Sequence, residues 1–187
     1  MRIVVVAGVV GALVAVAVPL AVAEGAGSAC GATVKVSDHM KFVINRYVQD
    51  EMRFDPGTVT VKSGCKLTFR FATAGQSESH SLTIVKQSDL PQTTAQMENC
   101  KICKQIASKH VAHPGHPAGP TNPIAHWIVN AGKPGFDEPG DSVVVAEAKG
   151  APPGHKSVAV TVSARAGTTL YFMCGLHPWM QGKIVVK

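Results

Sequence analysis

Aromatic and charged residues are scarce in this chain of 187 residues, at 5% and 16% of its composition. Nucleic-acid-binding surfaces typically combine basic stretches with interleaved aromatic side chains. In this chain the lysines are scattered, and no such stretch is present. We therefore expect no nucleic-acid partner. Valine, isoleucine and threonine are abundant instead, and these residue types favour a β-rich domain.

The N-terminal segment contains no charged residue between Arg2 and Glu24. An unbroken apolar run, residues 3–17, leads into Val18-Pro19-Leu20-Ala21-Val22-Ala23. This layout is typical of a secretory signal peptide that is cleaved after Ala23. The prediction is a signal peptide at residues 1–23 and one mature domain at residues 24–187. An uncleaved membrane anchor is the alternative, because the apolar run is long enough to span a bilayer.

Export follows from either reading of this segment. We expect the mature domain in the periplasm, on the outer face of the cell membrane, or secreted. Membrane association would require the N-terminus to remain uncleaved. Removing residues 1–23 takes away Arg2 alone and lowers the formal net charge from +6 to +5. This positive charge indicates a partner with an acidic surface.

Short alternating segments separated by turn signals predict a series of half-buried strands. Thr58-Val59-Thr60-Val61 alternates strictly after the turn signal Asp55-Pro56-Gly57. Another segment opens at His80, with Leu82 and Ile84 on the same side of the strand. The other predicted strands are residues 32–37, 66–71, 142–146, 157–163, 168–173 and 183–186. Residues 40–47 read as a continuation of the first strand, with a helix over residues 41–52 as the alternative.

The middle of the chain follows a different pattern. Residues 90–109 have helical composition, with apolar side chains at mixed three- and four-residue spacing. A loop rich in glycine and proline follows, with a short predicted strand at residues 124–129 and a turn-rich stretch at 132–140. The chain therefore predicts an all-β domain with a helical and loop insertion, at about residues 88–140, between its halves.

The strongest signal lies near the C-terminus. A predicted strand ends at Cys174, a tight loop presents His177 and Met180, and another strand follows at once. Thiolate, imidazole and thioether form a soft and unequal set of ligands. Two histidines and one cysteine in a trigonal plane, with a weak axial methionine, define a type 1 copper site. The loop lacks one histidine, and His80 is the best candidate because it opens a strand in the earlier half.

The segment at residues 171–186 resembles the C-terminal copper loop of the cupredoxins, and its Cys-x2-His-x2-Met spacing is most similar to that of amicyanin. Residues 52–64 also resemble the early strands and turn of that family. The resemblance covers both ends of the mature domain and leaves about residues 88–140 unaccounted for. It implies a Greek-key β-sandwich and one copper ion bound by His80, Cys174, His177 and Met180. It also implies electron transfer through the exposed edge of His177.

Three neighbours of the predicted ligands have structural interpretations. Met173 precedes Cys174 and is expected to point to the opposite face of its strand, where it packs. Trp179 is expected at the surface near His177. Gly182 allows the chain to pass close beneath the site.

Four further cysteines remain outside the copper loop: Cys30, Cys65, Cys100 and Cys103. An oxidising compartment allows disulfides, and four cysteines allow three pairings. We favour a link from Cys65 to Cys100 or Cys103, which would tie the insertion to the sandwich. A second metal or redox site is the alternative, because Cys100-x2-Cys103 is followed by histidines. These histidines are His110, His113, His116, His126 and His155. A thioredoxin-like activity is less favoured, since no βαβ pattern surrounds the pair.

The predicted function is single-electron transfer rather than enzymatic catalysis, because four ligands leave no open position on the copper. The partner would be a redox protein such as a cytochrome, an oxidase or a reductase. A small copper-dependent oxidoreductase with a second metal in the insertion is one alternative. However, the chain contains no His-x-His pair, which the multicopper oxidases carry. Copper storage or delivery is the other alternative.

Overall fold

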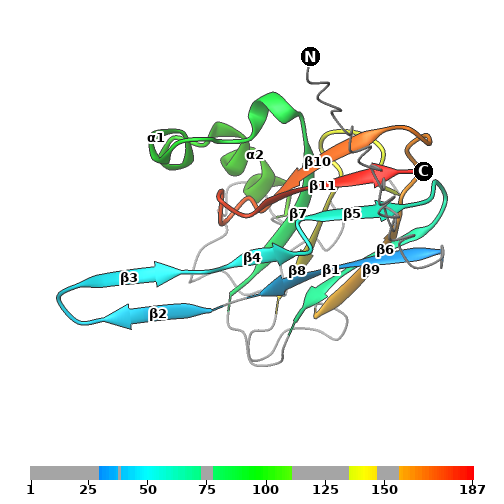
Figure 1. Ribbon diagram of the computed structural model, residues 1–187. Coiled ribbons are helices and arrows are strands. Elements are labelled where there is room, and N and C mark those ends of the chain that lie inside the picture. The colour runs from blue at the N-terminus through cyan, green and yellow to red at the C-terminus, as the bar shows by residue number, and fades with distance from the viewer. Residues whose placement is uncertain (1–29, 38, 73–77, 111–134, 147–155) are drawn as a thin grey trace, which may run out of the picture.

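In the computed structural model, which describes residues 30–37, 39–72, 78–110, 135–146 and 156–187, two β-sheets pack against each other (Figure 1). The first sheet has the strand order β4 (Arg53–Asp55), β1 (Gly31–Ser37), β6 (Lys66–Phe71) and β9 (Ser157–Thr161). The second has the order β5 (Thr58–Val61), β11 (Gln181–Val186), β10 (Thr169–Met173), β7 (His80–Val85) and β8 (Ser142–Val145). The pairs β1–β6 and β11–β5 are parallel, and the other pairs are antiparallel.

The space between the sheets is filled by the alternating apolar side chains that the sequence pattern places on one face of each strand. Leu67 and Phe69 from the first sheet share one buried cluster with Leu82 and Ile84 from the second. Phe54 joins the layers, with its ring centroid 5.9 Å from that of Phe69 and 5.1 Å from that of Phe172. The predicted Greek-key β-sandwich is confirmed.

Three helical segments follow β7: a short 3-10 helix (Gln87–Asp89), α1 (Thr94–Glu98) and α2 (Lys101–Lys109). The helical segment predicted at residues 90–109 is confirmed over residues 94–98 and 101–109, whereas residues 90–93 are not helical and Asn99 and Cys100 separate the two helices. Cys103 and Ile106 of α2 pack with Val85 and Met173 in a second buried cluster. In Figure 1 the helices accordingly lie beside the sheet that contains β7 and β10.

Every residue of β7 is buried, so the prediction of a half-buried strand is wrong for this element. One face of β7 lies in the sandwich core, which contains Leu82 and Ile84. On the other face, Val85 belongs to the buried cluster that contains Cys103 and Ile106 of α2. The helical part of the insertion therefore converts a surface strand into an interior one.

The segment predicted as one strand over residues 40–47, or as a helix over residues 41–52, is neither. It forms a hairpin of β2 (Met40–Val43) and β3 (Tyr47–Asp50). Asn45, with a φ of 57°, reverses the chain in the left-handed region that asparagine tolerates. Figure 1 shows the hairpin extending away from both sheets. The predicted strand at residues 124–129 lies outside the described residues.

Two disulfides link the four cysteines outside the copper loop, Cys30–Cys65 and Cys100–Cys103. The predicted link from Cys65 to the insertion is wrong. The parallel register of β1 and β6 sets Gly31 opposite Lys66, which brings the two preceding cysteines together. Cys100 and Cys103 are three residues apart at the start of α2, where one helical turn brings them close.

No helix in the described part of the chain is long and apolar enough to cross a membrane. The predicted signal peptide at residues 1–23 lies outside the described residues.

Gly182 on β11 is predicted to tolerate no side chain. A Cβ at this position would lie 2.5 Å from the Gly57 carbonyl oxygen and would overlap the buried Phe172 ring. We expect Gly182→Ala to lower the free energy of unfolding by about 1–3 kcal/mol, because neither neighbour has room to move. Urea unfolding followed by circular dichroism measures the change.

Gly31→Ala is the matched control, because its Cβ would meet only an ordinary contact at 3.4 Å, to the Lys66 carbonyl oxygen. Its free energy of unfolding should change by less than about 1 kcal/mol. Equal losses in the two variants would contradict the close passage at Gly182.

Candidate metal centre

Cys174 and His177 lie on the loop between β10 and β11, and His80 opens the neighbouring strand β7. The antiparallel register of β10 and β7 pairs Met173 with Thr83, so the end of one strand meets the start of the other. The loop is closed by two backbone hydrogen bonds. The Cys174 amide donates to the Met180 carbonyl at 3.0 Å, and the Met180 amide donates to the His177 carbonyl at 2.9 Å.

The three side chains converge on one point. The Nδ1 atoms of His80 and His177 are 3.1 Å apart, and the Cys174 Sγ is 3.7 Å from the His177 Nδ1. All three candidate ligand atoms lie within 4.8 Å of one another. His80 and Cys174 are fully buried, and His177 is 9% exposed. The edge of His177 therefore lies closest to solvent, as the sequence predicts.

The two measured separations are compatible with one metal ion held by these side chains. Metal–nitrogen and metal–sulfur bonds of about 2.0 and 2.3 Å, as in zinc sites, set two nitrogens about 3.5 Å apart and nitrogen and sulfur about 3.7 Å apart. The observed separations of 3.1 and 3.7 Å differ from these values by a few tenths of an ångström at most. The donor set of one thiolate and two imidazoles suits copper. The group formed by His80, Cys174 and His177 therefore indicates copper binding.

Met180, the fourth predicted ligand, is also inside the protein. Its side chain is 1% exposed and belongs to the core cluster that contains Cys174. The two loop hydrogen bonds described above fix its backbone relative to Cys174 and His177. The assignment of its thioether as an axial ligand stays a prediction.

The sulfur of Cys174 lies in an environment that favours the thiolate. Burial raises the pKa of this thiol, but hydrogen bonding to His177 and then to His80, together with the charge of both imidazoles, more than offsets it. The pKa falls from its ordinary value of 9.0 to about 5. The Ser81 amide also donates to the Cys174 Sγ at 3.4 Å, and the Ser81 hydroxyl accepts from the Gly175 amide at 2.8 Å.

Glu78 positions the ring of His177. Its carboxylate lies 2.8 Å from the His177 Nε2, which donates to it and leaves Nδ1 facing the metal centre. Burial lowers the pKa of His177, but the contact with the Cys174 thiolate and then that with Glu78 raise it above its ordinary value overall. The sequence analysis missed Glu78 and Ser81. Their only sequence signal is that they lie within two residues of His80.

The neighbours of the ligands lie as predicted. Trp179 is 44% exposed, its ring centroid is 5.3 Å from that of His177, and its Nε1 donates to the Met52 carbonyl. Met173 packs in the α2 cluster, on the face opposite Cys174. Gly175 is in contact with α2, because a Cβ there would lie 2.7 Å from the Ile106 Cγ2. Helix α2 of the insertion therefore packs directly against the loop that carries Cys174 and His177.

The second metal site considered for the insertion has no support among the described residues. Cys100 and Cys103 are joined in a disulfide, and His110 lies in hydrogen-bonding contact with the Ser142 hydroxyl. The histidines at 113, 116, 126 and 155 lie outside the described residues. Among the residues that the structure describes, one group contains three or more potential metal ligands, and it consists of His80, Cys174 and His177.

Neither a protein-family model nor any curated protein matches the chain. Among solved structures, it is similar to oxidised plastocyanin from Dryopteris crassirhizoma, at 16% identity and a TM-score of 0.38. That match covers 83% of this chain and 100% of the other. It is also similar to auracyanin A, a blue copper protein from Chloroflexus aurantiacus, at 22% identity and a TM-score of 0.40, over 84% and 99% of the two chains.

A further match is a multicopper oxidase, at 17% identity and a TM-score of 0.34, which covers 84% of this chain but 38% of the oxidase. Similarity at this level does not carry the assignment, which follows from the strand pairing and the site. The resemblance to the cupredoxins seen in the copper loop is confirmed by the two-sheet fold and by the His80–Cys174–His177 group that it assembles.

Proposed function

We propose that this protein is a type 1 copper protein that carries single electrons between redox partners. The observation that carries the proposal is the convergence of His80, Cys174 and His177, with ligand atoms within 4.8 Å of one another. These three residues, with Met180 as the axial ligand, would hold one copper ion. Bound copper supplies a one-electron redox centre through its Cu(I) and Cu(II) states.

The surroundings of the site support electron transfer rather than substrate chemistry. His80, Cys174 and Met180 are at most 1% exposed, so the chain excludes water and substrates from this side of the group. Backbone hydrogen bonds hold the loop, and Ser81 and Glu78 hold Cys174 and His177 in position. A rigid ligand set that changes little between oxidation states keeps the reorganisation small. The edge of His177, beside the exposed Trp179, gives the shortest path to a partner.

Replacement of the ligands provides the direct test. Copper-loaded protein should show an intense visible band that vanishes on reduction, because the band arises from charge transfer between the Cys174 thiolate and the metal. Cys174→Ser and His80→Asn should abolish it, whereas His39→Asn, at an exposed histidine outside the group, should keep it. Visible and paramagnetic-resonance spectra with a metal count measure the outcome, and the count should be one copper per chain. A band that survives in folded Cys174→Ser protein would overturn the assignment.

Two buried methionines provide a matched pair for the axial ligand. Met180→Leu removes a thioether donor at similar volume, so it should raise the reduction potential by on the order of 60 mV, a tenfold change in the one-electron equilibrium. Met173→Leu changes an equally buried methionine that packs in the α2 cluster, so its potential should stay close to that of the native protein. Spectroelectrochemical titration measures both. Equal shifts in the two variants would contradict axial ligation by Met180.

We further propose an acidic surface on the redox partner, which the formal net charge of +6 supports. A small anionic oxidant such as ferricyanide provides a probe that needs no identified partner. Its rate with the reduced protein should fall as salt is added, because ions screen the attraction between opposite charges. A cationic cobalt complex is the control, and its rate should rise. The reverse salt dependence would contradict the proposal for an acidic partner.

A further inference from the structure

The Cys100–Cys103 disulfide lies in the helical insertion, outside the candidate metal centre. Its cysteines are 3 residues apart, whereas those of Cys30–Cys65 are 35 residues apart. Since the stabilisation from a disulfide grows with the loop that it closes, Cys100–Cys103 restricts the unfolded chain far less. Stabilisation of the fold is therefore a weak explanation for the presence of this disulfide.

The position of Cys100 favours a reactive sulfur. Cys100 is the N-cap of α2, and its Sγ accepts a hydrogen bond from the Cys103 amide at 3.2 Å. The N-terminus of a helix carries partial positive charge, which stabilises a thiolate. Lys101, the next residue, is exposed and adds a full positive charge. Both features stabilise Cys100 as a thiolate, which favours its release from a mixed disulfide with an incoming thiol.

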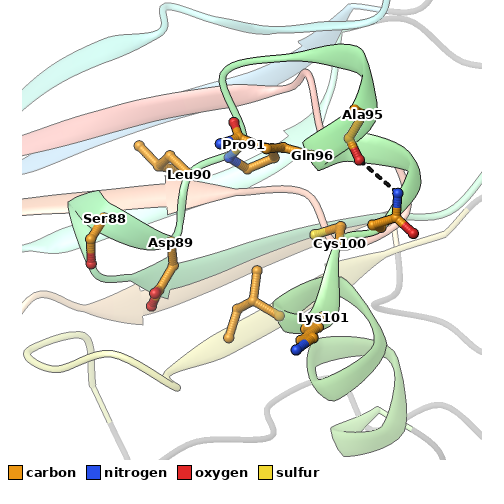
Figure 2. Close-up of a pocket in the computed structure, with 10 residues that line it drawn as sticks. Ser88, Asp89, Leu90, Pro91, Ala95, Gln96, Cys100 and Lys101 are labelled. Atoms are coloured by element: carbon orange, nitrogen blue, oxygen red, sulfur yellow. Dashed lines mark hydrogen bonds between the residues drawn. The ribbon is translucent and has the colours of Figure 1, made fainter.

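A cavity of about 400 Å³ opens onto this cysteine. Figure 2 shows its two walls. Ser88, Asp89, Leu90 and Pro91 form one wall, and Cys100 and Lys101 at the start of α2 stand on the other. A volume of this size accommodates a cysteine side chain with its neighbours, or a small thiol such as glutathione.

The two cysteines of the pair differ in their access to the cavity. Both belong to the buried cluster with Ile106 and Met173, but Cys100 also lines the cavity, whereas Cys103 is not among its lining residues. The Cys103 carbonyl oxygen also lies 3.5 Å from the position that a Cβ on Gly175 would occupy. An incoming thiol in the cavity therefore reaches Cys100 and not Cys103.

We propose that Cys100–Cys103 is a redox-active disulfide that exchanges with thiols entering this cavity. The incoming thiolate attacks the Cys100 Sγ and forms a mixed disulfide, while the bond to Cys103 breaks and Cys103 leaves as a thiolate that takes up a proton. A second thiolate attacks the donor sulfur of the mixed disulfide and releases Cys100. In total, two thiols are oxidised to one disulfide, and the protein pair gains two electrons and two protons.

Cys30–Cys65 serves as a control within the same molecule. Full-length folded protein is incubated with glutathione in one arm and with a short cysteine-containing peptide in the other. Free thiols are then alkylated and located by mass spectrometry. We expect Cys100–Cys103 to be reduced at least about tenfold faster than Cys30–Cys65 in one arm or both. Since Cys30 is itself exposed, a slow reaction there does not follow from burial alone.

The two arms identify the source of the thiol. Faster reaction with the peptide indicates a protein thiol, and faster reaction with glutathione indicates a small thiol. Equal rates for the two disulfides in both arms, or no reaction of Cys100–Cys103, would overturn the proposal. Circular dichroism before and after incubation shows that the fold is retained.

Single-cysteine variants test which sulfur is attacked. Incubated with oxidised glutathione, Cys103→Ser should form a stable mixed disulfide at Cys100 and release one glutathione thiol, because no neighbouring thiol remains to displace the adduct. Cys100→Ser should leave Cys103 unmodified in the folded protein, since Cys103 is buried and does not line the cavity. Preferential modification of Cys103 would contradict the geometry. The experiment on the native protein stands independently of whether either variant folds, and it requires no copper.

Discussion

The antiparallel pairing of β7 with β10 is the constraint on which the metal centre depends. It joins the start of one strand to the end of the other, so that His80 meets Cys174 although 94 positions separate them along the chain. A shift of this register by one residue would turn His80 away from the group, because alternate side chains of a strand point to opposite faces. The sandwich core, with Leu82 and Ile84 on the same side of β7 as His80, fixes this register.

The sequence predicts the ligands that lie close together along the chain, but only some of the site residues that come from distant segments. Cys174, His177 and Met180 lie within seven residues, so their spacing alone indicates a copper loop. His80 was found because the loop is incomplete without a second histidine and because it opens an alternating strand. Glu78 and the disulfide pairing depend on contacts between segments that periodicity does not report. The register of β1 and β6, which joins Cys30 to Cys65, is an example.

The hairpin of β2 and β3 shows a second limit of the sequence pattern. Phe42 and Val48 are apolar residues paired across this hairpin, but they are 64% and 62% exposed because the hairpin belongs to neither large sheet. Conversely, β7 reads as half-buried and is buried throughout, because α2 packs on its outer face. Periodicity predicts which side chains share a face, whereas the arrangement of distant segments decides whether that face is covered.

The charges of the metal centre explain why burial does not prevent a thiolate there. Removing Cys174 from water disfavours its charged form, yet its pKa falls to about 5 because hydrogen bonds from His177 and His80 and their electrostatic interaction with the sulfur favour the thiolate. The same contact raises the pKa of His177, and Glu78 on the other side of the ring adds to the effect. The loop therefore presents the sulfur in an environment that favours the thiolate, which is the form that binds a soft metal ion.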